Sequence, residues 1–205
     1  VEQAMAALNN RDLVSASAIV AADKRIDELE TEIEKLVVTT IALRAPMADD
    51  LRTMIAALKI AAVLERVGDY AKSIAKRVPL LSADRAIDAM PLLTSMAQIV
   101  CEMLRDVLAA YAGRDAAKAQ EVSVRDKQVD GFYNSIFRAL VTYMMENPRS
   151  ITESAHLLFI AKNLERAGDH ATNVAEMIYF AATGQHMDER EKGDDGHYIF
   201  GSPGA

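Results

Sequence analysis

A stripe of small and apolar side chains runs through the first half of the chain at helical spacing. It consists of Ala57, Ala61, Leu64, Gly68, Ala71, Ala75 and Val78. Steps of three and four residues place these side chains on one face of an α-helix. We predict that this face packs into a core and that the charged residues Glu65 and Asp69 lie at its margin.

Turn-forming residues divide the chain into segments of helical length. The breaks lie at Asn9-Asn10, Pro46, Pro79, Gly113 and Asn147-Pro148. The segments between them predict five long helices, at about residues 12–44, 47–77, 88–112, 115–147 and 150–183. Asp12 is the predicted N-cap of the first of these helices, and Gly113 is a predicted helix stop. Residues 185–205 mix acids with Gly and Pro, which predicts a flexible acidic tail.

The helical pattern is duplicated along the chain. The sequence LERVGD at residues 64–69 returns as LERAGD at residues 164–169, an offset of 100 residues. Upstream, the Arg-Asp pair at residues 11–12 returns at residues 114–115, an offset of 103. We expect the connection between the second and third helices to absorb this difference. A repeat of this length is a structural unit.

Each repeat is predicted to be a three-helix bundle, which makes the protein an all-α tandem repeat. The first bundle would cover residues 1–80 and the second residues 82–184, followed by the tail. In the first repeat only residues 1–8 precede the break, whereas a helix of about twenty-five residues precedes it in the second. The first helix is therefore expected to be truncated, with about fifteen or more residues missing upstream.

Composition narrows the class of protein. The chain has 205 residues, 5% aromatic residues and no Trp, which is typical of helices without strands. The single Cys101 excludes an internal disulfide and a thiolate-cluster zinc site, so we expect a reducing cytoplasm. No apolar run approaches the about 20 residues that span a bilayer, and no leader is apparent. The net charge of −7 argues against nucleic-acid binding.

Each repeat carries two pairs of acids spaced four apart, which project side by side from one helix face. The pairs are Asp23 with Asp27 and Glu65 with Asp69, then Asp126 with Asp130 and Glu165 with Asp169. The second and third helices of each repeat are expected to form an antiparallel hairpin. If the turn of the first hairpin is centred near residue 45 or 46, the position opposite Asp23 is residue 68, next to Asp69. Asp69 is therefore expected to face Asp23. In the second hairpin the facing acids are offset by about two residues, or about 3 Å of rise. We predict that four carboxylates gather at one level of each hairpin, open to solvent.

Clustered carboxylates repel one another, by about 0.7 kcal/mol for a pair about 6 Å apart even in water. A hard multivalent cation would convert this repulsion into attraction, because such ions prefer oxygen ligands. The pattern therefore predicts one cation site per repeat. A salt-bridge network is the alternative, with neutralising charges from Lys24, Arg66, Lys127 and Arg166. Gly68 and Gly168 stand beside the acids and are expected to allow close helix packing, or else to leave room for ligands.

The duplicated LERxGD motif, the D-x-x-x-D pairs upstream of it and the later Asn173-x-Ala175 resemble the PhoU family of bacterial regulators of phosphate uptake. The similarity extends from Val1 to about Gly184. This resemblance implies a cytoplasmic protein of two three-helix repeats, usually a homodimer. It also implies multinuclear sites for iron, zinc, magnesium or manganese at the eight acids named above.

The resemblance further implies regulation without catalysis. A PhoU-like protein would repress the phosphate-starvation response by bridging the ATPase subunit of the phosphate ABC transporter and the phosphate-sensing histidine kinase. The two copies of the motif differ in two nearby positions, since Tyr70 corresponds to His170 and Ser73 to Asn173. The two cation sites are therefore not expected to be identical.

Two alternatives remain open at the level of the sequence. Di-iron enzymes of the helical-bundle type carry Glu-x-x-His on two helices. Glu153 and His156 have this spacing, but their repeat counterparts are Thr53 and Ala56. No other catalytic arrangement accompanies them, and His156 and His170 are predicted to be ordinary surface or core residues. The third interpretation is a purely structural helical adaptor with empty acid clusters.

Overall fold

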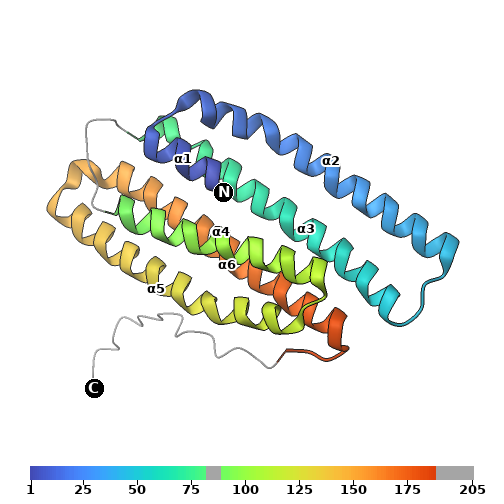
Figure 1. Ribbon diagram of the computed structural model, residues 1–205. Helices are drawn as coiled ribbons and strands as arrows, with labels where there is room; N and C mark the ends of the chain where they lie inside the picture. The colour runs from blue at the N-terminus through green and yellow to red at the C-terminus, as the bar shows by residue number, and fades with distance from the viewer. Residues whose placement is uncertain (82–88, 188–205) are drawn as a thin grey trace, which may run out of the picture.

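The computed structural model describes residues 1–81 and 89–187, and these residues form helices without any strand (Figure 1). The long helices are α1 (Glu2–Asn10), α2 (Leu13–Arg44), α3 (Asp49–Ala75), α4 (Met90–Gly113), α5 (Ala116–Glu146) and α6 (Ile151–Thr183). Two short 3-10 helices, Val78–Leu80 and Pro148–Ser150, lie between them. The predicted all-α fold is confirmed. Residues 188–205, most of the predicted tail, lie outside the described residues.

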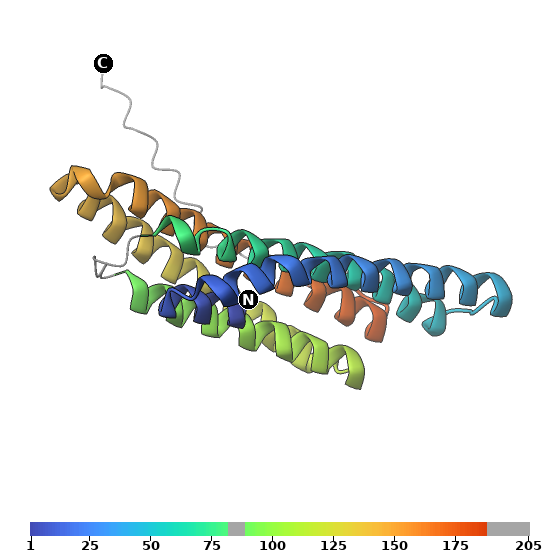
Figure 2. The ribbon, with the colours of Figure 1, turned by 90° about the horizontal axis from the view of Figure 1, so that it is seen from above.

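The helices pack as two three-helix bundles, the first from α1, α2 and α3 and the second from α4, α5 and α6. Two views at right angles show α3 and α6 side by side in the middle of the molecule, running antiparallel (Figure 2). Buried apolar side chains from both bundles belong to one continuous cluster. The predicted tandem of bundles is therefore present, and the two repeats share a core.

The first helix of the first bundle is much shorter than its counterpart in the second. Helix α1 has 9 residues, whereas α4 has 24. The α2–α3 hairpin projects beyond the other helices as a result (Figure 2). Ile33 on α2 is 36% exposed, whereas its counterpart Ile136 on α5 is fully buried. A full-length first helix buries this position in the second repeat, and the short α1 leaves it open in the first.

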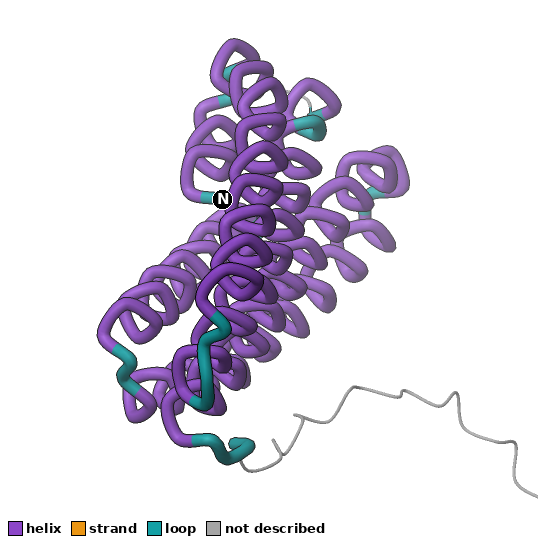
Figure 3. The backbone as a smooth tube through the Cα atoms, turned by 90° about the vertical axis from the view of Figure 1, so that its right-hand side faces the viewer, coloured by secondary structure: helices purple, strands orange, loops and turns teal. Residues whose placement is uncertain are grey.

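The same two-residue turn joins the first and second helices of both repeats; loops and turns are drawn in teal in Figure 3. Arg11 and Arg114 both adopt left-handed backbone conformations, with φ of 52° and 51°. Asp12 then accepts hydrogen bonds from the backbone N–H groups of Val14 and Ser15, which confirms it as an N-cap. Gly113 does not stop α4 as predicted, because it is the last helical residue and Arg114 makes the left-handed turn.

The core face of α3 is broader than the predicted stripe. Of that stripe, Ala61, Gly68, Ala71, Ala75 and Val78 are buried, whereas Ala57 and Leu64 are only half-buried. Ile60, Val67 and Ile74 are buried in addition. Helix α3 packs against α1, α2 and α6 at once, so more of its circumference is covered than a surface helix with a single buried stripe would need.

The helices of each hairpin pack closely at Gly68 and Gly168. A Cβ atom at Gly68 would lie 2.8 Å from Cδ1 of Ile26, and one at Gly168 would lie 3.2 Å from Cγ1 of Val129. Close packing is therefore the reason for both glycines. Ile26 and Val129 are repeat counterparts, as are the two glycines, so both hairpins have the same register.

The predicted register of the first hairpin is wrong by about one helical turn. The mirror argument placed residue 68 opposite Asp23, but Gly68 packs on Ile26 and Asp23 contacts Lys72. The turn spans residues 45–48 and its centre therefore lies beyond Pro46. Ala45 and Ala48 both have positive φ, which no residue-type rule predicts for alanine.

The extra residues of the first repeat do not lie in the helix connection as expected. Both connections span four residues, 45–48 and 147–150. Instead the helical arms of the first hairpin are longer. Helix α2 has 32 residues against 31 in α5, and α3 begins 16 residues before Glu65, whereas α6 begins 14 before Glu165.

Candidate functional site

Two carboxylates of the first acid cluster share one ammonium group. Lys72 on α3 donates a hydrogen bond to Asp23 on α2, and its Nζ also lies 3.4 Å from Oδ1 of Asp69. Asp23 and Asp69 are therefore both within reach of one lysine side chain, which the sequence analysis had not placed there. The prediction of an open cluster is wrong for Asp23, which is only 6% exposed. Asp27 and Asp69 are exposed.

Glu65 lies at the electrostatic centre of the first cluster. Burial raises the pKa of its carboxyl group, and the negative charges of Asp69, Glu30, Asp27 and Asp23 raise that pKa further. The four predicted acids are thus close enough to act on one another. Glu30 is a fifth acid that the sequence analysis missed. Its position three residues after Asp27 and seven after Asp23 is the helical spacing that could have found it.

The second acid cluster has a different charge partner. Oε1 of Glu165 accepts a hydrogen bond of 2.6 Å from Lys162, whose ammonium group also lies 5.2 Å from the centre of the Tyr133 ring. Oε2 of Glu165 is buried and has no hydrogen-bond partner among the described residues. The remaining acids of the cluster are half-buried and take part in polar or electrostatic interactions; they are Asp126, Asp130 and Asp169.

Two lysines that were not predicted pair with acids of the clusters. Among the described residues, no ion pair involves Lys24, Arg66 or Arg166. These two lysines are Lys72 and Lys162, whose repeat counterparts are Thr172 and Ala62. Both stand three residues from an acid of the LERxGD motif, a spacing that brings side chains together on a helix. Lys72 and Lys162 therefore stand at different positions of the two repeats.

The two positions that follow the LERxGD motifs meet at the contact between the repeats. Oη of Tyr70 and Nε2 of His170 lie 3.0 Å apart in a hydrogen bond, and the rings are stacked with centroids 5.6 Å apart. Ser73 accepts a hydrogen bond from Nδ2 of Asn163 one turn away. Burial lowers the pKa of His170, and the nearby positive charges of Arg66 and Arg166 act in the same direction. Residues that distinguish the two repeats therefore bind them together.

The acid clusters suit a hard cation in their donor chemistry but not in their present arrangement. Carboxylate oxygens are the preferred ligands of such ions, and the unpartnered Oε2 of Glu165 is a free ligand atom. Within residues 1–81 and 89–187, however, no three His, Cys, Asp or Glu side chains converge in a metal-binding arrangement. Glu153 and His156 belong to no such group either. The cation sites remain a prediction.

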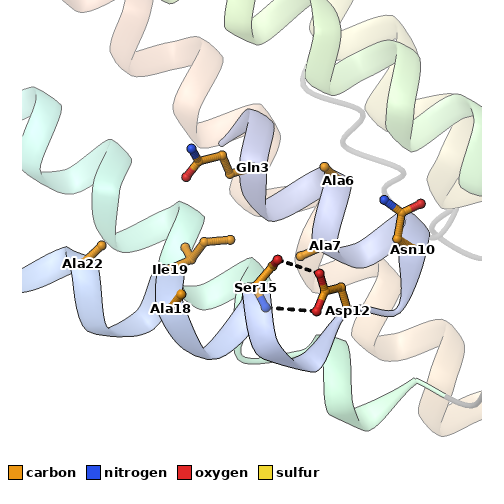
Figure 4. A pocket seen from close by; sticks show the side chains of 9 residues that line it. All are labelled: Gln3, Ala6, Ala7, Asn10, Asp12, Ser15, Ala18, Ile19 and Ala22. Carbon is orange, nitrogen blue, oxygen red and sulfur yellow. Dashed lines mark hydrogen bonds between the residues drawn. The ribbon is translucent and has the colours of Figure 1, made fainter.

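A groove of about 430 Å³ lies between α1 and α2 (Figure 4). Gln3, Ser15 and Ala22 line it. Their counterparts in the second repeat are Asp106, Lys118 and Arg125, where Lys118 and Arg125 lie 3.1 Å and 2.6 Å from the carboxylate of Asp106. Neutral residues thus line the groove in the first repeat at positions where the second repeat has an ion-paired triad.

No helix of the described residues is long and apolar enough to cross a lipid bilayer.

Comparisons with known proteins agree with the duplicated architecture. A family model described as the PhoU domain matches residues 1–78 and 93–178. A phosphate-specific transport system accessory protein PhoU homolog from Zymomonas mobilis is 56% identical over 187 residues, which cover 91% of this chain and 78% of the relative. The homolog from Caulobacter vibrioides is 50% identical over 188 residues, covering 91% and 82%. The crystal structure of PhoU from Pseudomonas aeruginosa superimposes with a TM-score of 0.82 at 35% identity, covering 89% of this chain and 88% of that one.

Proposed function

The chain belongs to the PhoU family, and on that premise we propose that it is a non-enzymatic regulator of phosphate uptake that represses the phosphate-starvation response. The observation that carries this proposal is the family match, which extends over both repeats. The names of the relatives describe accessory proteins of a phosphate-specific transport system.

We propose that the protein acts by docking, in the cytoplasm and as a homodimer. Its partners would be the ATPase subunit of the phosphate ABC transporter and the phosphate-sensing histidine kinase. The long helical faces and the negative net charge of −7 support a peripheral protein interface. Repression follows if this interface binds the inactive state of the kinase more tightly than the active state, because a ligand shifts an equilibrium only by its differential affinity.

We also propose that each acid cluster binds one or more multivalent cations, such as iron, zinc, magnesium or manganese. Asp23, Asp27, Glu65 and Asp69 would supply the ligands in the first repeat, and Asp126, Asp130, Glu165 and Asp169 in the second. The mutual repulsion that raises the pKa of Glu65 supports this assignment, since a cation would relieve it. A bound cation would rigidify the hairpins that present the docking faces.

The proposal includes no catalytic step. A bundle-type metal enzyme would need His ligands on two helices, and the Glu153–His156 spacing is not repeated. A purely structural adaptor would differ from the proposed regulator only in having no cations bound to the acid clusters. Measurement of the metal content of the protein therefore distinguishes these two functions.

Deletion of the gene in its native bacterium tests the regulatory role. In phosphate-rich medium, and in a strain without a paralogue, we expect a phosphate-starvation reporter such as alkaline phosphatase to become active after deletion. A plasmid copy of the wild-type gene should restore repression. A reporter that stays fully repressed without the protein would refute the proposal.

A further inference from the structure

Helix α2 carries a row of side chains with the seven-residue repeat of a coiled-coil helix, in which the first and fourth positions are apolar. The row, which we call the heptad face, consists of Ile26, Leu29, Ile33, Leu36, Thr40 and Leu43. Thr40 is its one polar member. Leu36 and Leu43 are 67% and 80% exposed, and Leu29 and Ile33 are 41% and 36% exposed. Large apolar side chains therefore lie in the open along one side of the helix.

The second repeat shows what kind of element covers this side of the hairpin. There α4 packs along α5, and Ile136, the counterpart of Ile33, is fully buried. In the first repeat α1 lies beside α2 only as far as about Ala22, which lines the same groove as Gln3 near the start of α1 (Figure 4). Residues 26–44 of α2 extend beyond α1 over about 28 Å. One further helix on this stretch would make the contact that α4 makes in the second repeat.

We propose that the heptad face binds the heptad face of a second copy of this chain, in an antiparallel pair of α2 helices. Each copy supplies both a covering helix and a covered face, so the contact closes under two-fold symmetry and needs no other protein. With the axis between Ile33 and Leu36, these two side chains of one copy meet Leu36 and Ile33 of the other. The apolar positions of one helix then fill the spaces between those of its partner.

The position of α1 determines the direction of the pair. In a parallel pair, residues 13–22 of the second α2 would occupy the space that α1 fills beside the first. In the antiparallel pair the hairpin tip of the second copy arrives there instead. Its Met47 is 81% exposed, and it would reach the end of the groove at Gln3 and Ala22. The small side chain of Ala22 continues the seven-residue spacing of Leu29, Leu36 and Leu43 into this groove.

This inference rests on the homodimer of the proposed function and names the surface that forms it. A contact about 28 Å long and one helix of about 10 Å wide is at the small end for stable protein pairs. We therefore expect a reversible dimer with a Kd of about 1 μM or weaker. The reporter experiment measures regulation in the cell, whereas association of the purified chain is measured without any partner protein.

Sedimentation velocity of the purified full chain over a range of concentrations tests the interface. We expect a monomer–dimer equilibrium. The double variant Leu36→Gln/Leu43→Gln should weaken dimerisation by about tenfold or more, because each substitution removes apolar surface from the contact twice. Its circular dichroism spectrum should match that of the wild type, since both side chains are exposed. Because the contact is apolar, dimerisation of the wild type should not weaken between about 0.1 M and about 1 M NaCl.

A matched control separates this face from general hydrophobic association. Val124 and Met145 on α5 are 68% and 79% exposed, close to the values for Leu36 and Leu43. Val124→Gln/Met145→Gln should leave the dimerisation constant within about twofold, because scattered exposed apolar residues are ordinary on a protein surface. In a Cys101→Ala background, Leu43→Cys should form no disulfide-linked dimer, because antiparallel pairing places the two cysteines at opposite ends of the contact.

Three outcomes would overturn the proposal, and they have different meanings. A wild type that stays monomeric at all concentrations would show that a helix of another protein or of a longer chain covers the face, and it would also remove the homodimer from the proposed function. A dimer that both double variants weaken equally, or that neither weakens, would leave the homodimer standing on another surface. A disulfide-linked dimer of Leu43→Cys would refute the antiparallel arrangement.

Discussion

Three glycine-to-alanine substitutions test the helix packing that sets the register of both hairpins. A mid-helix glycine is less stable than alanine by about 1 kcal/mol. Each substitution therefore increases the free energy of unfolding by this amount, less the energy cost of any close contact that the new Cβ atom makes. Gly131 on α5 has no atom within 4 Å of the added Cβ, so Gly131→Ala should raise the free energy of unfolding by about 1 kcal/mol.

The two motif glycines differ in what the added Cβ meets. At Gly68 the contact is the far end of the half-buried Ile26 side chain, at 2.8 Å. That methyl group can move at a cost of about 0.5–1.5 kcal/mol, so Gly68→Ala should be close to neutral. At Gly168 the contacts are Cγ1, Cγ2 and Cβ of Val129, at 3.2, 3.5 and 3.6 Å. Val129 is buried and β-branched, so it cannot rotate away.

Gly168→Ala should therefore lower the free energy of unfolding by about 1 kcal/mol, because overpacking of about 1–3 kcal/mol exceeds the propensity gain. Urea denaturation followed by circular dichroism measures all three variants. In thermal melts each kcal/mol should shift the midpoint by about 2–4 °C. The expected order of stability is Gly131→Ala, then Gly68→Ala, then Gly168→Ala. If Gly168→Ala were as stabilising as Gly131→Ala, the close contact of α5 with α6 would be refuted.

Three further predictions concern single acidic residues. Asp115→Ala should lower the free energy of unfolding by about 1 kcal/mol, measured by urea denaturation, because it removes the N-cap of α5. Lys118 and Arg125 hold the pKa of Asp106 below its usual range, so the stability deficit of Asp106→Asn at pH 7 should shrink as the pH falls through that lowered pKa. The pKa of Glu65 is raised by burial and by the neighbouring acids, so its negative charge destabilises the metal-free protein at neutral pH. Glu65→Gln should therefore raise the thermal midpoint at pH 7. The difference from the wild type should disappear in acid, and also when a divalent cation is added.

The sequence was sufficient to predict the elements and their duplication. Proline, asparagine and aspartate marked the helix ends, since each restricts or caps the backbone locally. The repeated Arg-Asp pair at residues 11–12 and 114–115 predicted the same turn twice, and the structure has it twice. The glycines of the two motifs predicted close packing, which the structure places against counterpart residues.

The contacts between helices were harder to predict, because they depend on loop geometry and on docking of the bundles. The turn of the first hairpin spans residues 45–48 and is centred beyond Pro46, so Lys72, rather than residue 68, faces Asp23. The Tyr70–His170 contact joins positions 100 residues apart. The repeat showed that the two positions correspond, but only the antiparallel packing of α3 on α6 makes them touch.

The central claim is that the duplicated acid clusters bind cations, and elemental analysis of the purified native protein tests it most directly. We predict stoichiometric metal in the wild type, clearly less in Glu165→Ala/Asp169→Ala, and unchanged metal in Glu121→Ala/Glu146→Ala, which removes two exposed acids outside the clusters. All three proteins should have the same helix content, because none of these changes touches the apolar core. A wild-type protein without metal, or equal metal in all three, would contradict the claim.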